Sequence, residues 1–470
     1  MAPTAPDEIG RRLQSAVRLL QEGKLAEAEA VCAALTAAPG APVDALNLHA
    51  AICGESGRLD EAVRLLERAI ATAPDNPRTQ FNLGVLHQRR GDGARARAAY
   101  EAAARIDPGF APAWVNLGHL QLQSDAPAAA ETAFRAALRA DPQQLNAREG
   151  LGVALHLQGR NEEAAAVLQQ ALDLAPDNPA LHIQLGVVRH SLGDAAAAAD
   201  RYRHALAAQP DDAECQALLS TALYDLRDYA GALAANDAAL RREPGSARAL
   251  MMRALILAQR GDAAGARAVL AVDRFIRVSQ PTARDDTGDG FHAAIAREIL
   301  AHPTLTADRP NKTTMKGAQT GELFATPPTP ALGTLRDLIV AQIHGYTDKL
   351  GGGDHPFQRS IPARWHLRSW ATVLNRGGHQ DPHYHPSGWL SGVYYVQVPE
   401  VIARGQDKAG YIEFGRPDPR YAIDFTPEVE LFEPVPGRMV LFPSYTWHRT
   451  LPFESDEQRI SVAFDVVPLR

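Results

Sequence analysis

The first half of the chain repeats one arrangement of small and large residues. The periodic positions are prolines at 74, 108, 142, 176, 210 and 244 and glycines at 84, 118, 152 and 186, both spaced by 34 residues. Sixteen positions after the glycine slot come Tyr100, Phe134 and, in the last unit, Leu270. Small residues let two helices of a unit pack closely, and each proline ends the second helix of its unit. The pattern predicts an all-α solenoid.

The second half alternates between apolar and polar positions. Strands are expected over 391–398, 438–442 and 458–466, and amphipathic helices over 291–301 and 332–350. Residues 271–278 are expected to extend the last repeat helix or to start the first strand, and the polar stretch 279–290 to form a connector. In the last strand, Arg459 and Ser461 share one face while Ile460 and Val462 share the other. A buried arginine needs an anionic partner, so the pattern predicts a pocket for an acid.

Three histidines are candidates for a metal site beside this pocket. His383 and His385 are two positions apart, so in an extended segment they point to one face while Tyr384 points away. His448 follows the expected strand 438–442 and would add an imidazole from a distant part of the chain. Together with Arg459, these residues predict a pocket that holds a metal ion and an acid.

Two regions resemble known families. Trp114-x-x-Leu117-Gly118 and the period of 34 resemble the tetratricopeptide repeat (TPR), over residues 1–270 in about eight units. This resemblance implies that the concave face of the solenoid binds a protein or peptide. Asn82, Asn116 and Gln184 are candidates for contacting a peptide there.

Residues from roughly 270 to 470 resemble the Fe(II)- and 2-oxoglutarate-dependent oxygenases, and most closely the family called "putative 2OG-Fe(II) oxygenase". The motifs that carry the resemblance, in order, are His383-x-His385-Pro386, Ser391-Gly392-Val393-Tyr394-Tyr395, Gly437-x-x-Val440-x-Phe442-Pro443, His448 and Arg459-x-Ser461. The resemblance implies a double-stranded β-helix (jelly-roll, cupin-like) domain over 271–470 with bracing helices. It also implies an enzyme, a dioxygenase that uses Fe(II) as cofactor and O2 and 2-oxoglutarate as cosubstrates.

The same resemblance implies roles for individual residues. His383 and His448 match the metal ligands, and Arg459 matches the residue that binds the far carboxylate of 2-oxoglutarate, with Ser461 assisting. Tyr395 matches a position that often hydrogen-bonds the same cosubstrate. An arginine fork suits a carboxylate, because its two parallel N–H groups match the two oxygens.

The third metal ligand stays open at this point. Most members of the superfamily carry Asp or Glu two residues after the first histidine, where this chain has His385. The site is therefore all-histidine, or Asp381 or an outside carboxylate completes it, or only two protein ligands bind. His379-Gln380-Asp381 is itself an H-x-D sequence. We favour His383 and His385, because the preceding Gly377-Gly378 lines up with the glycines of prolyl hydroxylases.

Composition narrows the class of protein. A length of 470 residues predicts more than one domain, and a formal charge of −7 argues against nucleic-acid binding. Cys32, Cys53 and Cys215 are widely spaced and are expected to be reduced core residues. With no signal-like or membrane-spanning stretch, the expected location is the cytoplasm.

We expect a hydroxylase that acts on a protein or peptide side chain recruited by the TPR groove. Two alternatives remain. One is a small-molecule oxygenase whose repeats serve assembly, and the other is a non-catalytic TPR scaffold with a cupin-like binding domain.

Overall fold

The computed structural model describes residues 6–38, 40–281, 290–307, 313–324, 328–405 and 407–469. Most of the connector expected over 279–290 lies outside these ranges. The chain divides into two compact units, Met1–Pro176 and Asp177–Arg470. Each is described by itself below.

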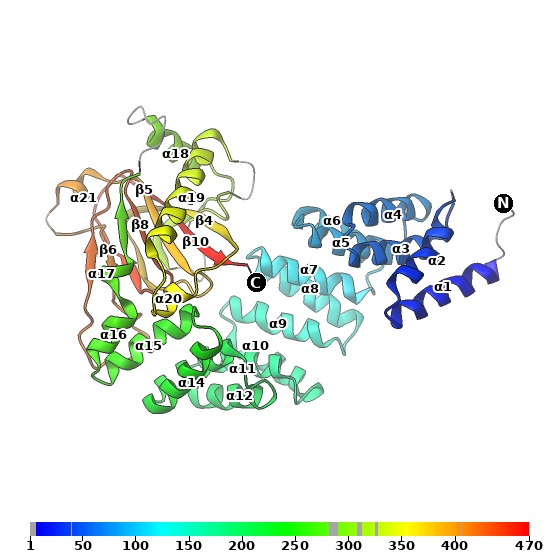
Figure 1. The fold of residues 1–470 in the computed structure, drawn as a ribbon, viewed down its shortest axis with the longest axis horizontal. Helices are drawn as coiled ribbons and strands as arrows, with labels where there is room; N and C mark the ends of the chain where they lie inside the picture. Colours follow the sequence, from blue (N-terminus) through cyan, green and yellow to red (C-terminus); the bar gives the residue numbers. More distant parts are fainter. Residues whose placement is uncertain are drawn as a thin grey trace. The chain divides into compact units, whose positions relative to one another are not determined.

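Helices occupy the first 270 residues in pairs (Figure 1). Within the described residues, the ten helices of the first unit are α1 (Pro6–Gln21), α2 (Leu25–Thr36), α3 (Val43–Glu55), α4 (Leu59–Thr72), α5 (Pro77–Arg89), α6 (Gly93–Ile106), α7 (Ala111–Gln123), α8 (Pro127–Ala140), α9 (Leu145–Leu157) and α10 (Asn161–Leu174). The second unit continues the series with α11 (Pro179–Ser191), α12 (Ala195–Ala208), α13 (Ala213–Asp225), α14 (Tyr229–Arg242), α15 (Ala247–Gln259) and α16 (Ala263–Leu270). The eight pairs from α1/α2 to α15/α16 confirm the predicted repeat solenoid.

The periodic glycines are explained by the large residues that pack on them. A Cβ atom added to Gly84 would lie 2.5 Å from the ring of Tyr100, and one added to Gly118 would lie 2.7 Å from the ring of Phe134. Since both rings are fully buried, they have no free space into which to move. The absence of a side chain in one helix therefore makes room for the aromatic ring of the next.

The second unit adds an antiparallel sheet. Its strands are β1 (Arg277–Ser279), β2 (Thr306–Ala307), β3 (Thr314–Gln319), β4 (Trp365–His383), β5 (Leu390–Gln397), β6 (Ile412–Phe414), β7 (Glu430–Phe432), β8 (Met439–Pro443), β9 (His448–Thr450) and β10 (Arg459–Pro468). Neighbours run in the order β1-β8-β5-β10-β4-β9-β6-β7, and β3 pairs with both β2 and β4. The strands expected over 391–398, 438–442 and 458–466 correspond to β5, β8 and β10. The segment 271–278 does not extend the last repeat helix, because α16 ends at Leu270 and Ala271 is left-handed. It forms a separate short helix, α17 (Val272–Phe275), and then starts the first strand, β1, as the second expectation had it.

The sheet curls on itself. Strand β6 is four places from β5 in the hydrogen-bonded order, yet Phe414 of β6 shares one buried cluster with Tyr395 of β5 and Phe442 of β8. The rings of Phe414 and Phe442 are 4.8 Å apart. This closure, with helices on the outside, confirms the predicted jelly-roll fold.

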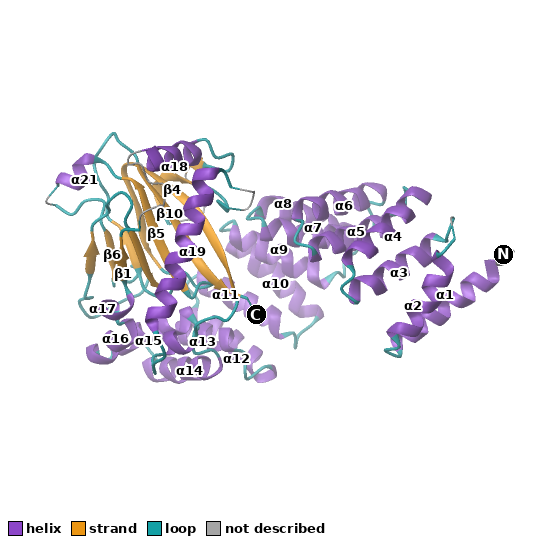
Figure 2. Cartoon of the chain, turned by 45° about the horizontal axis from the view of Figure 1, so that its top comes forward, coloured by secondary structure: helices purple, strands orange, loops and turns teal. Residues whose placement is uncertain are grey.

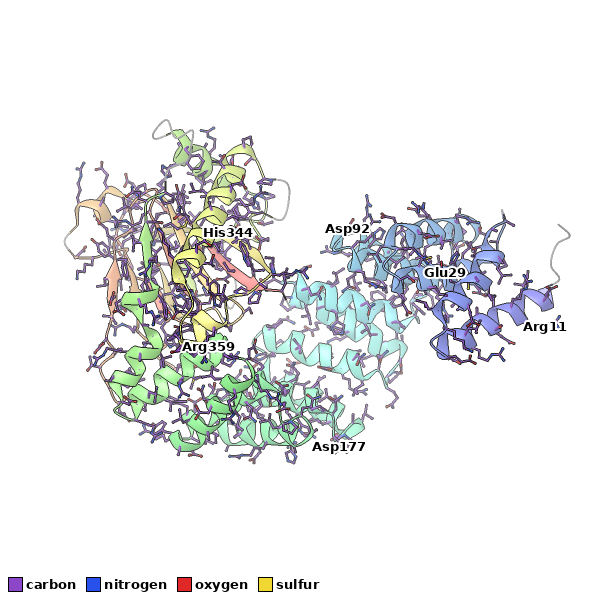
Figure 3. All side chains as sticks on the ribbon, in the orientation of Figure 1. Arg11, Glu29, Asp92, Asp177, His344 and Arg359 are labelled. Carbon is purple, nitrogen blue, oxygen red and sulfur yellow. The ribbon has the colours of Figure 1, made fainter. Side chains whose placement is uncertain are left out.

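Helices α18 (Gly290–Leu300) and α19 (Pro330–Leu350) lie across the outer face of the sheet (Figure 2), and both match predicted helices. Two shorter helices are α20 (Pro356–Arg359) and α21 (Glu400–Arg404). Leu335, Ile339 and Ile343 of α19 are buried in the same cluster as strand residues such as Phe464. In Figure 3, His344 marks this helix, and its ring lies 5.7 Å from that of Trp365 at the start of β4.

The last repeats share their core with the sheet. Met251 and Leu255 of α15 belong to one hydrophobic cluster with Phe275, Leu390 and Phe464 of the C-terminal region. The Tyr445 hydroxyl also donates a hydrogen bond to the Val269 carbonyl, at 2.9 Å. The predicted division into 1–270 and 271–470 puts the boundary at the end of α16, whereas the compact units divide after residue 176. Among the helices of the described ranges, none is long and apolar enough to cross a membrane.

Candidate active site

Strand pairing brings the three histidines together. His383, the last residue of β4, lies directly opposite His448, the first residue of β9. His385 follows two residues after β4, and its backbone N–H donates to the Ser444 carbonyl at 2.9 Å. One possible ligand atom from each of these three residues lies within 4.8 Å of those of the other two. The imidazoles therefore converge from two strands that are distant in sequence.

Each imidazole has a hydrogen-bond acceptor at Nδ1. Nδ1 of His383 lies 2.7 Å from the Asp381 carbonyl oxygen, and Nδ1 of His448 lies 3.1 Å from the Thr446 carbonyl oxygen. Nδ1 of His385 lies 2.5 Å from a carboxylate oxygen of Asp465. Acceptors at Nδ1 fix the tautomer in which Nδ1 carries the hydrogen and Nε2 presents a lone pair. All three Nε2 atoms are thus suited to bind a metal ion.

A small polar network holds His385 in place. Asp465 is buried and also accepts a hydrogen bond from the Ser391 hydroxyl, which lies 2.7 Å from its carboxylate. The same hydroxyl lies 2.8 Å from that of Ser444. Sequence reasoning missed Asp465. The alternation of β10 places Asp465 on the same inner face as Arg459 and Ser461, and a charged residue on that face could have indicated its role.

The alternative ligand Asp381 lies elsewhere. Its carboxylate is not among the converging groups, and its side chain is 58% exposed. Its nearest histidine is His379, whose Nε2 is 3.6 Å from the Asp381 carboxylate. The register of β4 against β9 shifts between Gln380 and His383, so the simple alternation that would give Asp381 and His383 one face is interrupted.

The inner face of β10 places a buried cation beside a tyrosine. Arg459 is 1% exposed, and its Nε and Nη1 atoms have no hydrogen-bond partner. Its guanidinium carbon lies 5.0 Å from the centre of the Tyr395 ring, whose hydroxyl also lacks a partner. Ser461 is buried on the same face, directly opposite Tyr395 in the pairing of β10 with β5. These groups form a cradle of donors suited to a carboxylate.

Burial shifts the pKa values of these groups. Loss of solvation, helped by the nearby His385, lowers the pKa of His383 to about 3, and burial holds the pKa of His448 well below its usual value. Burial also lowers the pKa of Arg459, although Tyr395 opposes that change, and it raises the pKa of Tyr395. Each shift disfavours the charged form, so His383 and His448 are neutral and able to bind a metal ion at neutral pH.

A row of aromatic rings connects the histidines to the repeats. Tyr384, between His383 and His385, packs edge-on against Trp447 with the ring centres 5.1 Å apart. Trp447 packs against Tyr421, and Tyr421 packs against Tyr224 of helix α13. The Tyr224 hydroxyl donates to the Ala422 carbonyl at 3.0 Å. Helix α13 therefore supports the segment that positions the two histidines.

The first unit contains a groove of about 500 Å³ along its repeats. Residues of α1, α3 and α5 line it, among them Arg18, Asp44, Arg78 and Asn82. Asn82 donates to the Asn47 side chain at 3.1 Å. Of the other expected peptide contacts, Asn116 donates to the Tyr100 hydroxyl at 3.3 Å, and Gln184 lies half-buried on α11. All three side chains thus lie on the first helix of a pair, as predicted.

Family models match both parts of the chain. The family described as "Putative 2OG-Fe(II) oxygenase" matches residues 368–465. Tetratricopeptide-repeat models match residues 54–109, 115–179 and 217–275, and a second one matches 155–222. The chain therefore carries tetratricopeptide repeats followed by a domain that matches a 2OG-Fe(II) oxygenase family, which confirms both resemblances. No curated protein matches the sequence.

Among solved structures, the similar chains include TPR proteins. A chain of the APC/C hetero-tetramer Cut9-Hcn1 is 22% identical with a TM-score of 0.42, and the match covers 53% of this chain and 49% of that one. This chain thus matches about half the length of that relative. PilF of Pseudomonas aeruginosa is 24% identical, with coverages of 42% and 90% and a TM-score of 0.38. YrrB, a TPR protein with an unusual peptide-binding site, is 22% identical, with coverages of 39% and 95% and a TM-score of 0.35.

Proposed function

We propose that the protein is an Fe(II)- and 2-oxoglutarate-dependent dioxygenase. The observation that carries this proposal is Arg459, a buried guanidinium with two unpartnered nitrogen atoms on the inner face of a curled sheet. Such a cation is costly unless an anion is bound to it. The matched oxygenase family supplies the anion, because 2-oxoglutarate presents a carboxylate at its far end.

His383, His385 and His448 are the proposed metal ligands, each through Nε2. Three imidazoles suit Fe(II), although the set departs from the two-histidine, one-carboxylate arrangement. The carboxylate of Asp465 would not bind the metal itself. It would orient His385 through the hydrogen bond at Nδ1 of that ligand. When bound, Fe(II) and 2-oxoglutarate supply the oxidising chemistry by which O2 hydroxylates a C–H bond.

The chain's other residues would orient the cosubstrate and exclude water. Arg459 would hold the far carboxylate with two parallel hydrogen bonds, and Ser461 and Tyr395 would donate further ones. Phe414 and Phe442 place apolar rings 6.0 and 4.7 Å from that of His448. Apolar walls beside a metal site limit access of water to it.

The substrate we propose is a protein or peptide side chain. Support comes from the repeats, which in similar proteins accompany protein binding, and from the groove in the first unit. Arg18, Arg78 and Asp44 give that groove charges of both signs, and apolar Leu13 and Leu48 also line it. An extended peptide with mixed charge would suit this lining.

The first test is an anaerobic titration of the full-length protein with Fe(II) and 2-oxoglutarate, monitored by the metal-to-ligand charge-transfer band in the visible range. We expect a band in the wild type, a weaker one in Arg459→Ala, none in His385→Ala and an unchanged one in Asp381→Ala. Absence of the band from metal-loaded wild type would contradict the oxygenase function. A band lost only in Asp381→Ala would reassign the third ligand.

A second test concerns the substrate. With a panel of peptides, wild type should release succinate in proportion to the hydroxylated peptide formed. Arg78→Glu, in the groove of the first unit, should lower turnover of the peptide while leaving the charge-transfer band unchanged. Stimulation by small molecules but by no peptide would favour the alternative of a small-molecule oxygenase.

A further inference from the structure

A second group of metal-binding side chains lies in the first helix pairs, within the first unit. Glu29 of α2 and His49 and Cys53 of α3 each offer a ligand atom, and these atoms lie within 4.8 Å of one another. Figure 3 labels Glu29 on its helix. His49 and Cys53 are four residues apart on α3, so they lie on one face of that helix.

The repeats themselves show how unusual these residues are. Counting forward from His49 in steps of 34, the equivalent residues are Leu83, Leu117, Leu151, Leu185 and Leu219. Thr36 is likewise equivalent, in steps of 34, to the apolar residues Ile70, Leu138 and Leu172 of later repeats. The side chains of Thr36 and His49 are joined by a hydrogen bond of 2.8 Å. The equivalents of His49 in the first and last repeats are Ser15 and Arg253, but no other equivalent pair of positions in the repeats has both residues polar.

The Nδ1–H group of His49 can donate to the Thr36 hydroxyl oxygen, and this hydrogen bond orients the imidazole. Thr36 lies at Nδ1 of His49, so the Nε2 atom is the one available to a ligand. His49 is 6% exposed and Cys53 is fully buried, while the Glu29 side chain is 28% exposed. Burial lowers the pKa of His49 and raises that of Cys53. The imidazole is therefore neutral, and a metal ion would have to displace the thiol proton.

A cation already lies among these ligands. Nη2 of Arg58 is 2.6 Å from a carboxylate oxygen of Glu29 and 3.6 Å from the sulfur of Cys53. The Arg58 side chain is 42% exposed, and its Nε is 3.4 Å from the carboxylate of Glu61. Arg58 can therefore swing outward to Glu61, which leaves Glu29 and Cys53 free for another cation.

We propose that Glu29, His49 and Cys53 form a binding site for a thiophilic divalent metal ion such as Zn²⁺, separate from the three-histidine site. A thiolate, an imidazole and a carboxylate are all zinc ligands, held at about 2.0–2.3 Å from the ion. The present separation within 4.8 Å requires small side-chain rotations and the outward movement of Arg58. The ion would tie α2 to α3 where the repeat has lost its usual leucine.

Cobalt(II) is the probe, because thiolate ligation gives a near-ultraviolet charge-transfer band that three imidazoles cannot give. Metal-free full-length protein titrated with Co²⁺ should develop this band, and Zn²⁺ should abolish it. Cys53→Ser should remove the band. Cys215→Ser is the matched control and should keep it, because Cys215 is equally buried but lies in the second unit.

Two further variants separate a metal site from a merely structural cluster. His49→Leu restores the leucine of five other repeats, so it should fold normally. It should bind Co²⁺ at least about tenfold more weakly, because loss of a ligand should cost no less than loss of a residue that orients one. Arg58→Gln should bind Co²⁺ more tightly than wild type, because a competing cation is gone. Absence of the band in wild type, or its survival in Cys53→Ser, would overturn the proposal.

Discussion

The same repeat pattern runs through both units, but it is buried in different ways. In Met1–Pro176, core residues form small clusters that join neighbouring helices, such as the one around Tyr100 and Leu117. In Asp177–Arg470, the repeat residues Met251 and Leu255 instead belong to one large cluster with the sheet. The first arrangement is that of a solenoid, in which each repeat depends on its neighbours. The second makes the last repeats part of the unit that contains the candidate active site.

This difference predicts which fragments fold, and the expected effect is the largest of those described here. A fragment of residues 177–470 should fold and keep the Fe(II)–2-oxoglutarate band. A fragment of residues 271–470 exposes the apolar face that α13 and α15 cover, so it should aggregate or melt far below the longer one. Circular dichroism and size-exclusion chromatography would compare them. Equal melting temperatures would show that the repeats are dispensable to the sheet.

A substitution of Arg459 tests the role of the second unit at its candidate active site. Arg459→Met should weaken 2-oxoglutarate binding by on the order of 100-fold, since charged hydrogen bonds contribute about 1.5–3 kcal/mol each. The same change removes a buried, unpaired charge, so without cosubstrate the variant should be more stable by about 1–3 kcal/mol. Calorimetric titration and chemical denaturation measure the two effects. A variant that loses both binding and stability would indicate a structural arginine.

Gly118 provides the corresponding test in the first unit. Gly118→Ala would place a methyl group 2.7 Å from the buried Phe134 ring, so the free energy of unfolding should fall by about 1–3 kcal/mol. The Fe(II)–2-oxoglutarate band in the second unit should not change. Gly93→Ala is the matched control, because its nearest atom is 3.8 Å away. Equal stability of the two variants would contradict the proposed role of the glycine slot.

A smaller effect is expected from the acid titration of one buried carboxylate. Burial opposes ionisation of Glu413, but hydrogen bonds from Arg416 and Arg449 prevail and lower its pKa below the usual 4.5. The folded state thus releases this proton more readily than the unfolded state, so the contribution to stability is present above pH 4.5 and is lost as the pH falls further. Glu413→Gln should flatten the acid side of the stability profile, measured by denaturation between pH 3 and 7. An unchanged profile would mean that the two arginines do not stabilise the carboxylate.

Much of the architecture could be predicted from local pattern. The spacing of 34 identified the helix pairs, because each unit repeats the same small and large positions. Alternation predicted β5, β8 and β10, and the order of motifs pointed to His383, His448 and Arg459. These features depend on residues close in sequence or on a regular period, which the chain displays directly.

Other features depend on contacts between residues far apart in the chain. The carboxylate at His385 comes from Asp465, 80 positions away, and its role follows from the pairing of β10 with β5. Asp381 turns away because the register shifts in β4, which alternation alone does not reveal. The sequence by itself determined the helices, strands and chemical groups of this protein. Tertiary structure decided which groups meet and which repeats share a core with the sheet, because burial and pairing bring together residues that no local pattern relates.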